Sequence, residues 1–326
     1  GHVIGWNIAA VYIGLSLGPP AGGWMVGQFG WRSIFWLNSI LCAVVLWLTL
    51  RYLRREWKEA AGEKFDAPGA AAYALGIVAL MYGLSTLPAS RGYAALAAAA
   101  AALGLFIHWE GRTSTPLLEV RLLRGNRVFA FSNLAALISY SATFAVGFLL
   151  SLYLQYIKGL TPQQAGLVMI SQPVMQALFS PVAGRLSDRI EPRLIASAGM
   201  ALTAAGLALL FFLERTTGVA YISLSLVVLG IGFGLFSSPN TNAIMGAVER
   251  RQFSVASATL ATMRMLGQMF SMGMTALVIA LFVGHRQIGA ENQGGFLDGM
   301  HLLLGGFALL SLAGIFASLA RGKVHR

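Results

Sequence analysis

Long stretches without Asp, Glu, Lys or Arg follow one another along the whole chain, separated by short charged connectors. A helix needs about 20 apolar residues to cross a bilayer core of about 30 Å. Leu, Ala, Gly and Phe dominate the stretches without strict alternation, which favours helices over the strands of a barrel. We therefore predict an all-α polytopic membrane protein. The ten expected spans are residues 1–31, 33–50, 67–90, 92–109, 128–157, 159–184, 194–213, 216–248, 252–285 and 299–320.

The composition of the chain supports this interpretation. The 326 residues are 57% hydrophobic and 11% charged, whereas a soluble domain is about 45–50% apolar and about 25% charged. These values exclude a soluble enzyme, a disordered tail and a disulfide-stapled secreted domain. The single cysteine, Cys42, allows neither an internal disulfide nor a zinc cluster. We expect no metal site and no bound cofactor.

Membrane topology explains the net charge of +11. If residues 51–66 are cytoplasmic and the sides alternate, 17 of the 23 Lys and Arg residues fall in cytoplasmic connectors, in agreement with the positive-inside rule. This bias supports the count of ten spans and predicts a cytoplasmic C-terminus. The basic residues are spread over every inner connector and form no patch, so the sequence does not support a nucleic-acid partner.

Two cytoplasmic connectors are longer than the others. Residues 51–66 are strongly charged, and we expect them to extend a helix into the cytosol. Residues 110–127 place apolar side chains at 117, 118, 120, 122 and 123 with charges between them, which is typical of a short amphipathic segment on the inner membrane surface. An ordinary charged loop explains the same residues equally well. Neither connector is long enough for a separate soluble domain.

The first predicted span begins at Gly1. No charged segment precedes it, so it does not resemble a signal peptide. The simplest interpretation is a truncated fragment. The alternative is a protein with a short start, from which the initiator methionine was removed.

Small residues recur along the first span with regular spacing. Positions 14, 18 and 22 share one helix face, where the absence of side chains lets another helix approach closely, and the proline bends the helix. A plain packing face explains any single pair, but the whole pattern favours a smooth, kinked helix that rocks against a neighbour. The pattern consists of Gly5, Gly14, Gly18, Pro19, Gly22 and Gly23.

This glycine pattern resembles the antiporter motif, motif C, on the fifth helix of the major facilitator superfamily. The run from Trp31 to Asn38 and the segments Phe65 to Gly69 and Pro116 to Glu119 resemble the fourteen-helix drug:proton antiporter branch of that superfamily. The resemblance covers essentially the whole chain. It implies the major facilitator fold, with the ten spans as family helices five to fourteen.

The resemblance also implies a division of the chain into three parts. Residues 1–50 would be the last two helices of the N-terminal bundle. Residues 51–127 would be a linker with two extra transmembrane helices and cytoplasmic loops, and residues 128–326 the C-terminal six-helix bundle. The first four family helices would precede this chain.

A second motif, Gly184 to Arg189 with the sequence GRLSDR, lies between the sixth and seventh spans. It resembles the cytoplasmic gate loop, motif A, of the superfamily. Gly184 permits a tight turn, and we expect Asp188 to pair with arginines and to cap the next helix. Glu191 and Pro192 stand where the family has Gly and Arg, so the latch is expected to be weaker or differently wired. A basic inner loop with a helix cap is the alternative.

Arg264 is the only charged residue inside a predicted span, and a charge at membrane depth marks a candidate functional position. It belongs to a mostly polar helical stripe, which we expect to face a water-filled cavity. Alternatively, the start of this long span projects into the cytosol and Arg264 only reaches the interface. The stripe consists of Ser257, Ala261, Arg264, Gln268, Ser271 and Thr275.

Further polar residues are expected along a path through the membrane. Two glutamines lie one turn apart beside Pro173 in the sixth span, and residues 237–242 predict a polar helix break in the eighth. Broken helices expose backbone groups where such a path needs them, although polar contacts between helices explain each single residue as well. By resemblance, spans one, five, six, eight and nine line the central cavity. The candidates are Asn133, Tyr140, Gln172, Gln176, Asn240 and Asn242.

Acidic residues are absent from the ten predicted spans. Asp66 and Asp298 stand at span ends, and Glu110 and Glu214 stand just outside. A proton-coupled exporter needs a titratable group in its path, and by resemblance such carboxylates lie on the first and fourth family helices. A proton gradient as the energy source therefore follows from the resemblance alone, and we expect this chain by itself not to transport.

Three function classes are open at this point. Sparse charge, 11% aromatic residues and 12 methionines suit an adaptable apolar cavity. We favour a secondary active transporter in a prokaryotic cytoplasmic membrane, most of all proton-coupled efflux of hydrophobic or amphipathic drugs. A transporter-like sensor or scaffold is the alternative, and a membrane enzyme has little support because the spans lack an acid–base or metal constellation. The expected partners are the bilayer and a small-molecule substrate; nothing identifies a periplasmic adaptor.

Overall fold

The computed structural model describes residues 14, 17–18, 20–52, 66–87, 89–113, 116–118, 120–249, 252–284 and 288–322. Within these ranges the chain forms helices joined by turns and contains no strand, which confirms the predicted all-α class. The elements are α2 (Arg32–Tyr52), α3 (Ala67–Thr86), α4 (Ser90–Glu110), α5 (Val120–Gly125), α6 (Arg127–Leu152), the π-helix η1 (Tyr153–Ile157), α7 (Pro162–Met169), α8 (Ser171–Ser187), α9 (Pro192–Phe211), α10 (Val219–Gly246), α11 (Phe253–Phe282) and α12 (Gln293–Ala320).

Nine helical segments in the described part of the chain are long and apolar enough to cross a membrane. They coincide with nine of the ten predicted spans. The remaining span, residues 1–31, lies mostly outside the described ranges, and residues 20–29 of it are helical. The last span begins earlier than predicted, at Gln293, because Asp298 lies exposed on the helix surface and does not end the helix.

The two long connectors are only partly described. Residues 51–52 continue α2, and residues 53–65, where we predicted a helical extension, lie outside the described ranges. In the other connector, α5 forms a helix of six residues within the predicted amphipathic segment. Glu110 was predicted just outside a span, and this was wrong: it is the last residue of α4 and is 2% exposed.

Two proline-containing segments behave differently from each other. The sixth span is interrupted at Ile170, between α7 and α8. Pro173 follows three residues later and lacks the N–H that would bond back to Met169, which explains the interruption. The predicted break at residues 237–242 was wrong, since α10 continues through Pro239. Side-chain bonds support the helix there, including one from Thr241 Oγ1 to Ser237 O at 2.9 Å.

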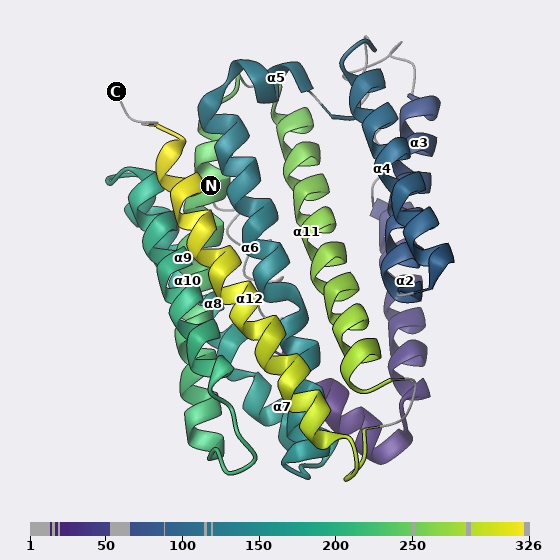
Figure 1. The fold of residues 1–326 in the computed structure, drawn as a ribbon. Helices are drawn as coiled ribbons and strands as arrows, with labels where there is room; N and C mark the ends of the chain where they lie inside the picture. Colours follow the sequence, from purple (N-terminus) through teal and green to yellow (C-terminus); the bar gives the residue numbers. More distant parts are fainter. Residues whose placement is uncertain are drawn as a thin grey trace.

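The helices run up and down side by side, so that alternate connectors gather at opposite ends (Figure 1). At one end, which we call the basic end, Arg127 Nε donates to Ala320 O at 2.8 Å and Asn126 Nδ2 donates to the backbone of α10's C-cap. At the other end, the Tyr153 hydroxyl donates to Glu214 O at 2.6 Å. These long-range bonds join connectors that are far apart in sequence.

Glycines allow close packing around α10. A Cβ on Gly232 would stand 2.6 Å from the backbone nitrogen of Thr203 in α9, and one on Gly234 would stand 3.2 Å from Gln176 O in α8. The two glycines therefore hold α10 between α8 and α9. The largest buried cluster combines leucines from several helices, among them Leu149 of α6 and Leu303 of α12.

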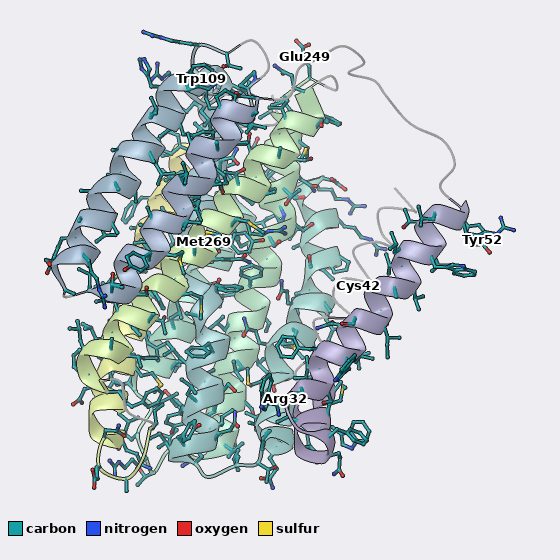
Figure 2. All side chains as sticks on the ribbon, turned by 90° about the vertical axis from the view of Figure 1, so that its right-hand side faces the viewer. Arg32, Cys42, Tyr52, Trp109, Glu249 and Met269 are labelled. Atoms are coloured by element: carbon teal, nitrogen blue, oxygen red, sulfur yellow. The ribbon has the colours of Figure 1, made fainter. Side chains whose placement is uncertain are left out.

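The remaining helices lie outside this bundle. The α3–α4 hairpin packs on the far side of α11 in Figure 1, where Leu84 of α3 reaches the backbone of Gly273. Helix α2 stands further out, as Figure 2 shows, and has no buried residue against the described chain. The predicted division of the chain into two bundles and a linker stays a prediction.

Candidate functional site

The motif C residues can be followed from Gly14 onward. A Cβ on Gly23 would stand 2.9 Å from the carbonyl carbon of Pro162 and 3.0 Å from the Cα of Gln163. The helix at residues 20–29 therefore meets the first turn of α7 backbone to backbone. Gly14, Gly18 and Gly22 have no atom of the described chain within 4 Å of their Cβ positions. Gly5 and Pro19 lie outside the described residues.

Residues at the start of the motif A-like loop bring α8 into close contact with α10. A Cβ on Gly184 would stand 2.8 Å from Ser238 Oγ, so the glycine lets α8 approach α10. One turn later, Ser187 Oγ donates to Gly184 O and accepts a bond of 2.7 Å from Asn242 Nδ2. Asn242 therefore acts as a link between helices in this structure, one of the two roles that the sequence left open.

The expected helix cap by Asp188 was wrong. Asp188 is exposed and forms the C-cap of α8, and Arg189 beside it is exposed as well. Three further residues separate Asp188 from the start of α9 at Pro192, and Glu191 occupies the N-cap position without a side-chain capping bond. The intervening turn keeps the Asp188 carboxylate away from the free amides of α9.

Gln172 and Gln176 lie on α8 immediately after the interruption of the sixth span. Both are half-buried. Their backbones face α10, because a Cβ on Gly230 would stand 3.1 Å from the carbonyl carbon of Gln172 and one on Gly234 would stand 3.2 Å from Gln176 O. Close packing thus fixes the backbone that carries the two amides, one turn apart.

Tyr140 lies where α6, α10 and α11 meet. Its ring packs edge-on against Phe233 of α10, with ring centroids 5.4 Å apart. Its Cβ is 3.0 Å from the Cβ position of Gly267 on α11. Gln268, the next residue on α11, is half-buried. The structure therefore brings the neighbourhoods of Tyr140 and Gln268 together.

The polar stripe of α11 changes its environment along the helix. Arg264 and the stripe residues before it are exposed, whereas Ser271 and Thr275 are fully buried. Ser271 Oγ accepts a bond of 3.0 Å from the backbone amide of Ala145 in α6. Only the part of the stripe up to Arg264 is therefore open, and the part from Ser271 onward is buried, with Ser271 packed against α6.

A buried polar network joins the basic ends of α6, α10 and α12. Arg321 is 0% exposed, and its Nη1 donates to Asn240 Oδ1 at 2.9 Å and to Ser132 Oγ at 3.3 Å. Asn240 Nδ2 in turn donates to Ser132 O at 3.1 Å. Asn133 is also fully buried and donates to Phe129 O. Asn133 and Asn240 thus lie inside the helix packing.

Arg321 was not among the residues predicted for a site. Burial and the nearby positive charge of Arg193 together lower its pKa to about 10, and Glu191 opposes the change. Its Nε and Nη2 atoms have no hydrogen-bond partner in the described structure. The sequence gives no signal for this role, because Arg321 is one basic residue among several that follow the last span.

In the described ranges, no three His, Cys, Asp or Glu side chains gather in the manner of a metal site. The arrangement instead provides half-buried amides, an aromatic pair and an exposed cation around α6, α8, α10 and α11.

Comparison with known proteins places this architecture in a family. The family described as Major Facilitator Superfamily matches residues 1–133 and 132–325. The riboflavin transporter RibZ of Clostridioides difficile is 30% identical over 86% of this chain and 61% of its own length. The multidrug resistance protein Stp of Mycobacterium tuberculosis is 30% identical over 86% of the chain and 53% of its own.

A third relative is the methylenomycin A resistance protein of Streptomyces coelicolor, 31% identical over 86% of this chain and 59% of its own length. The chain thus spans between about half and three fifths of the length of these relatives. With the family match over nearly every residue and nine apolar helices in the described ranges, the chain is an integral membrane protein that belongs to the major facilitator superfamily.

Proposed function

We propose that the protein is a secondary active transporter that exports hydrophobic or amphipathic drugs in exchange for protons. The observation that carries this proposal is the family match across the chain, together with relatives named for multidrug and methylenomycin A resistance. The motif C glycines add an export direction by resemblance. The proposal applies to the complete gene product.

Alternating access needs a contact about which two bundles can rock. The backbone contact between Gly23 and Pro162 suits this role, because no side chain there has to be moved. Residues 1–50 would then belong to one bundle and residues 128–326 to the other, with residues 51–127 as the linker. The contact lies at the outer end of α7, which directly precedes the interruption at Ile170.

The open polar groups beside this contact are the proposed substrate path. Gln172 and Gln176 offer amides at half-buried positions, and Tyr140 offers an aromatic face. On α11, Arg264 is exposed and Gln268 is half-buried, and we include both in the proposed path. A few polar groups on a largely apolar wall suit amphipathic compounds of varied shape.

The proposed orientation follows from the charges at the two ends of the bundle. The basic end carries Arg112, Arg124 and Arg127, and the chain leaves α12 there at Arg321. Under the positive-inside rule this end faces the cytoplasm. We therefore propose a plasma membrane protein of a prokaryote with a cytoplasmic C-terminus.

A second candidate is transport of riboflavin or a similar heterocyclic metabolite. The relative named as a riboflavin transporter matches the same share of the chain at the same identity as the multidrug resistance protein Stp. An aromatic flavin ring would suit the Tyr140–Phe233 pair as well as a drug would.

The test is an accumulation assay in cells that lack their own drug exporters and riboflavin importers. Cells producing the complete gene product are compared with empty cells for a cationic dye and for riboflavin. If the protein exports drugs, the producing cells should contain less dye than the empty cells, and a protonophore should remove this difference. Higher riboflavin content alone supports the second candidate, and no change in either compound, with the protein present in the membrane, supports a sensor or scaffold and contradicts both.

A further inference from the structure

Two carboxyl groups meet at the basic end of the α3–α4 hairpin. Asp66 immediately precedes α3, and Glu110 is the last residue of α4. They are 6% and 2% exposed. Every other Asp or Glu in the described ranges is half-buried or exposed. Trp109, labelled in Figure 2, marks the place on the hairpin.

One oxygen of each carboxyl group is bound by neutral donors. Asp66 Oδ1 accepts a bond of 3.0 Å from the amide of Gly69, which caps α3, and one of 2.9 Å from Trp109 Nε1. Glu110 Oε2 accepts a bond of 2.7 Å from the amide of Leu118 in the connector after α4. These bonds fix both side chains in place.

The second oxygen of each group has no donor. Asp66 Oδ2 and Glu110 Oε1 are buried and without a hydrogen-bond partner in the described structure. Both point to the same place, because a Cβ on Gly69 would stand 2.7 Å from Glu110 Oε1 and even closer to Asp66 Oδ2. The two carboxyl groups are close enough there for Asp66 to act on Glu110. Glycine at position 69 is what leaves room for them to meet.

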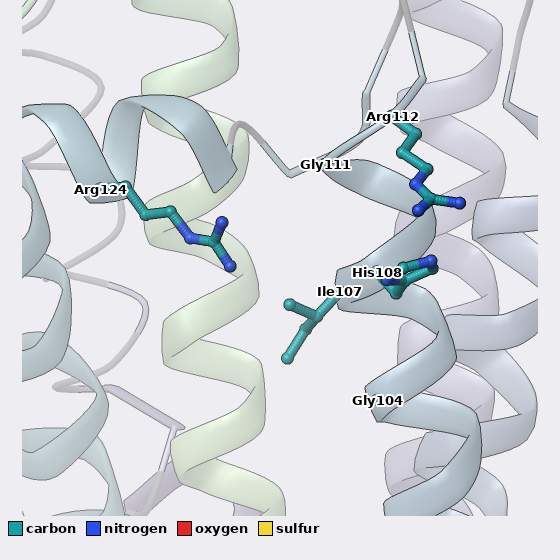
Figure 3. Close-up of a pocket in the computed structure, with 6 residues that line it drawn as sticks. All are labelled: Gly104, Ile107, His108, Gly111, Arg112 and Arg124. Atoms are coloured by element: carbon teal, nitrogen blue, oxygen red, sulfur yellow. The ribbon is translucent and has the colours of Figure 1, made fainter.

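Within the described ranges, no basic side chain forms an ion pair with either carboxyl group. Arg264 of α11 is exposed, and Tyr73 of α3 packs on Phe106. Among the described residues, Asp66 is the one charged side chain that acts on Glu110. His108, Arg112 and Arg124 line a cavity of about 390 Å³ between α4 and α5 (Figure 3). Its lining is Gly104, Ile107, His108, Gly111, Arg112 and Arg124.

The wall around the pair is apolar. Phe106 and Leu118 are buried beside it, and Met263 of α11 packs against them. Two carboxylate ions in contact in such surroundings would repel each other and leave two oxygens without solvation. One proton between them removes a charge and supplies the missing donor to both oxygens.

We propose that Asp66 and Glu110 form a proton-binding site that holds a single shared proton in this conformation. The proton bridges Asp66 Oδ2 and Glu110 Oε1 and comes from water at the basic end. When the connector at Leu118 moves away, the carboxyl groups separate and become hydrated, and the proton is released because hydrated carboxyl groups are ionised at neutral pH.

The site contacts elements through which its protonation state can affect the rest of the molecule. Glu110 holds the connector that leads into α5, and the hairpin touches α11 through Met263 and through Leu84 against Gly273. The inference depends on the geometry of the hairpin and on no transported compound, so it stands or falls separately from the proposed function.

Infrared spectroscopy of the complete gene product in lipid nanodiscs tests the site directly. A protonated buried carboxyl group gives a C=O stretching band that a carboxylate lacks. We expect such a band at pH 7, and we expect Glu110→Gln and Asp66→Asn each to abolish it, because the new amide donates the missing hydrogen bond and the remaining acid ionises. Asp298→Asn, which removes an exposed acid on α12, should leave the band unchanged. A wild-type spectrum without the band, or a band that survives both substitutions, overturns the proposal.

A second measurement covers variants that fold poorly. Trp109 donates to Asp66, so its fluorescence should report ionisation of the pair. The difference between wild-type and Trp109→Phe spectra should change when pH is raised until the pair loses its proton. The same difference taken in a Glu110→Gln background should be constant over that range. A wild-type difference that does not vary with pH contradicts the shared proton.

Discussion

Gly199 of α9 and Gly232 of α10 meet backbone to backbone: a Cβ on Gly232 would stand 2.8 Å from Gly199 O, and one on Gly199 would stand 2.6 Å from Gly232 O. We expect Gly232→Ala to destabilise the protein by about 2 kcal/mol, because the added methyl group forces two helices apart. Thermal unfolding in detergent, followed by circular dichroism, measures the loss. Gly306→Ala on α12, where nothing lies within 4 Å, is the control and should be neutral or slightly stabilising. Equal behaviour of the two variants would contradict the packing.

The bond between Asn240 and Arg321 makes a second stability prediction. Asn240→Ala removes the 2.9 Å acceptor of a buried guanidinium and should cost about 2–3 kcal/mol. Asn242→Ala removes the 2.7 Å bond to Ser187 but leaves no buried charge without its acceptor, so it should cost less, about 1 kcal/mol. Unfolding midpoints of the two variants give the comparison, and a larger loss for Asn242→Ala would be the wrong order.

The lowered pKa of Arg321 predicts a pH dependence of stability with a definite sign. Burial, together with Arg193, lowers this pKa to about 10, so the folded protein releases the proton before the unfolded chain does. The unfolded state then binds more protons above about pH 10, and stability gains from Arg321 as pH rises through that value. The free energy of unfolding of the wild type should therefore rise relative to that of Arg321→Met as pH is raised above about 10. A difference that is constant with pH would argue against a buried charged guanidinium.

If the Gly23–Pro162 contact is needed for transport, a bulky side chain at Gly23 should abolish transport without lowering the amount of protein in the membrane. Gly23→Leu inserts a side chain where a Cβ already lies 2.9 Å from Pro162 backbone, and we expect drug resistance to fall to background. Gly27→Leu, on the same helix with nothing within 4 Å in the described chain, is the matched control. Resistance is measured beside the amount of each variant in the membrane. Equal resistance of the two variants at equal amounts would remove the contact from the mechanism.

Variants of Arg264 distinguish a side chain that lines the substrate path from one that only reaches the membrane interface. If it lines the substrate path, Arg264→Ala should reduce drug resistance at unchanged expression, and Arg264→Lys should retain part of it because the charge is kept. If the side chain only reaches the membrane interface, both variants should keep full resistance. Resistance assays with expression controls decide between these outcomes.

The helices were predictable because the membrane imposes a strong rule on sequence: spans must be apolar and long. Nine predicted spans agree with helices of the structure, and residues 20–29 of the tenth are helical. Helix ends were less predictable, since a single acid was read as a boundary. Asp298 lies exposed on α12 and Glu110 lies buried at the end of α4, and charge alone does not distinguish the two.

Prolines were equally ambiguous in the sequence. Pro173 accompanies a break in its span and Pro239 does not. Beside Pro239, Asn240 bonds to Ser132 of α6 and Asn242 bonds to Ser187 of α8. In the candidate site, polar residues on open helix faces, such as Gln172 and Gln176, could be predicted from their polarity and spacing in the sequence. Arg321 could not, because its burial depends on how α6 and α10 fold around it. The meeting of Asp66 with Glu110 likewise depends on packing across 44 positions of sequence.

The most direct test of the account is transport by the purified complete gene product in proteoliposomes. With a proton gradient that is acid inside, a lipophilic cationic dye outside should accumulate in liposomes whose protein has its basic end outward. Collapse of the gradient by a protonophore should abolish the accumulation, and Gly23→Leu should reduce it to the level of empty liposomes. Accumulation that is the same with and without folded protein would contradict export by alternating access.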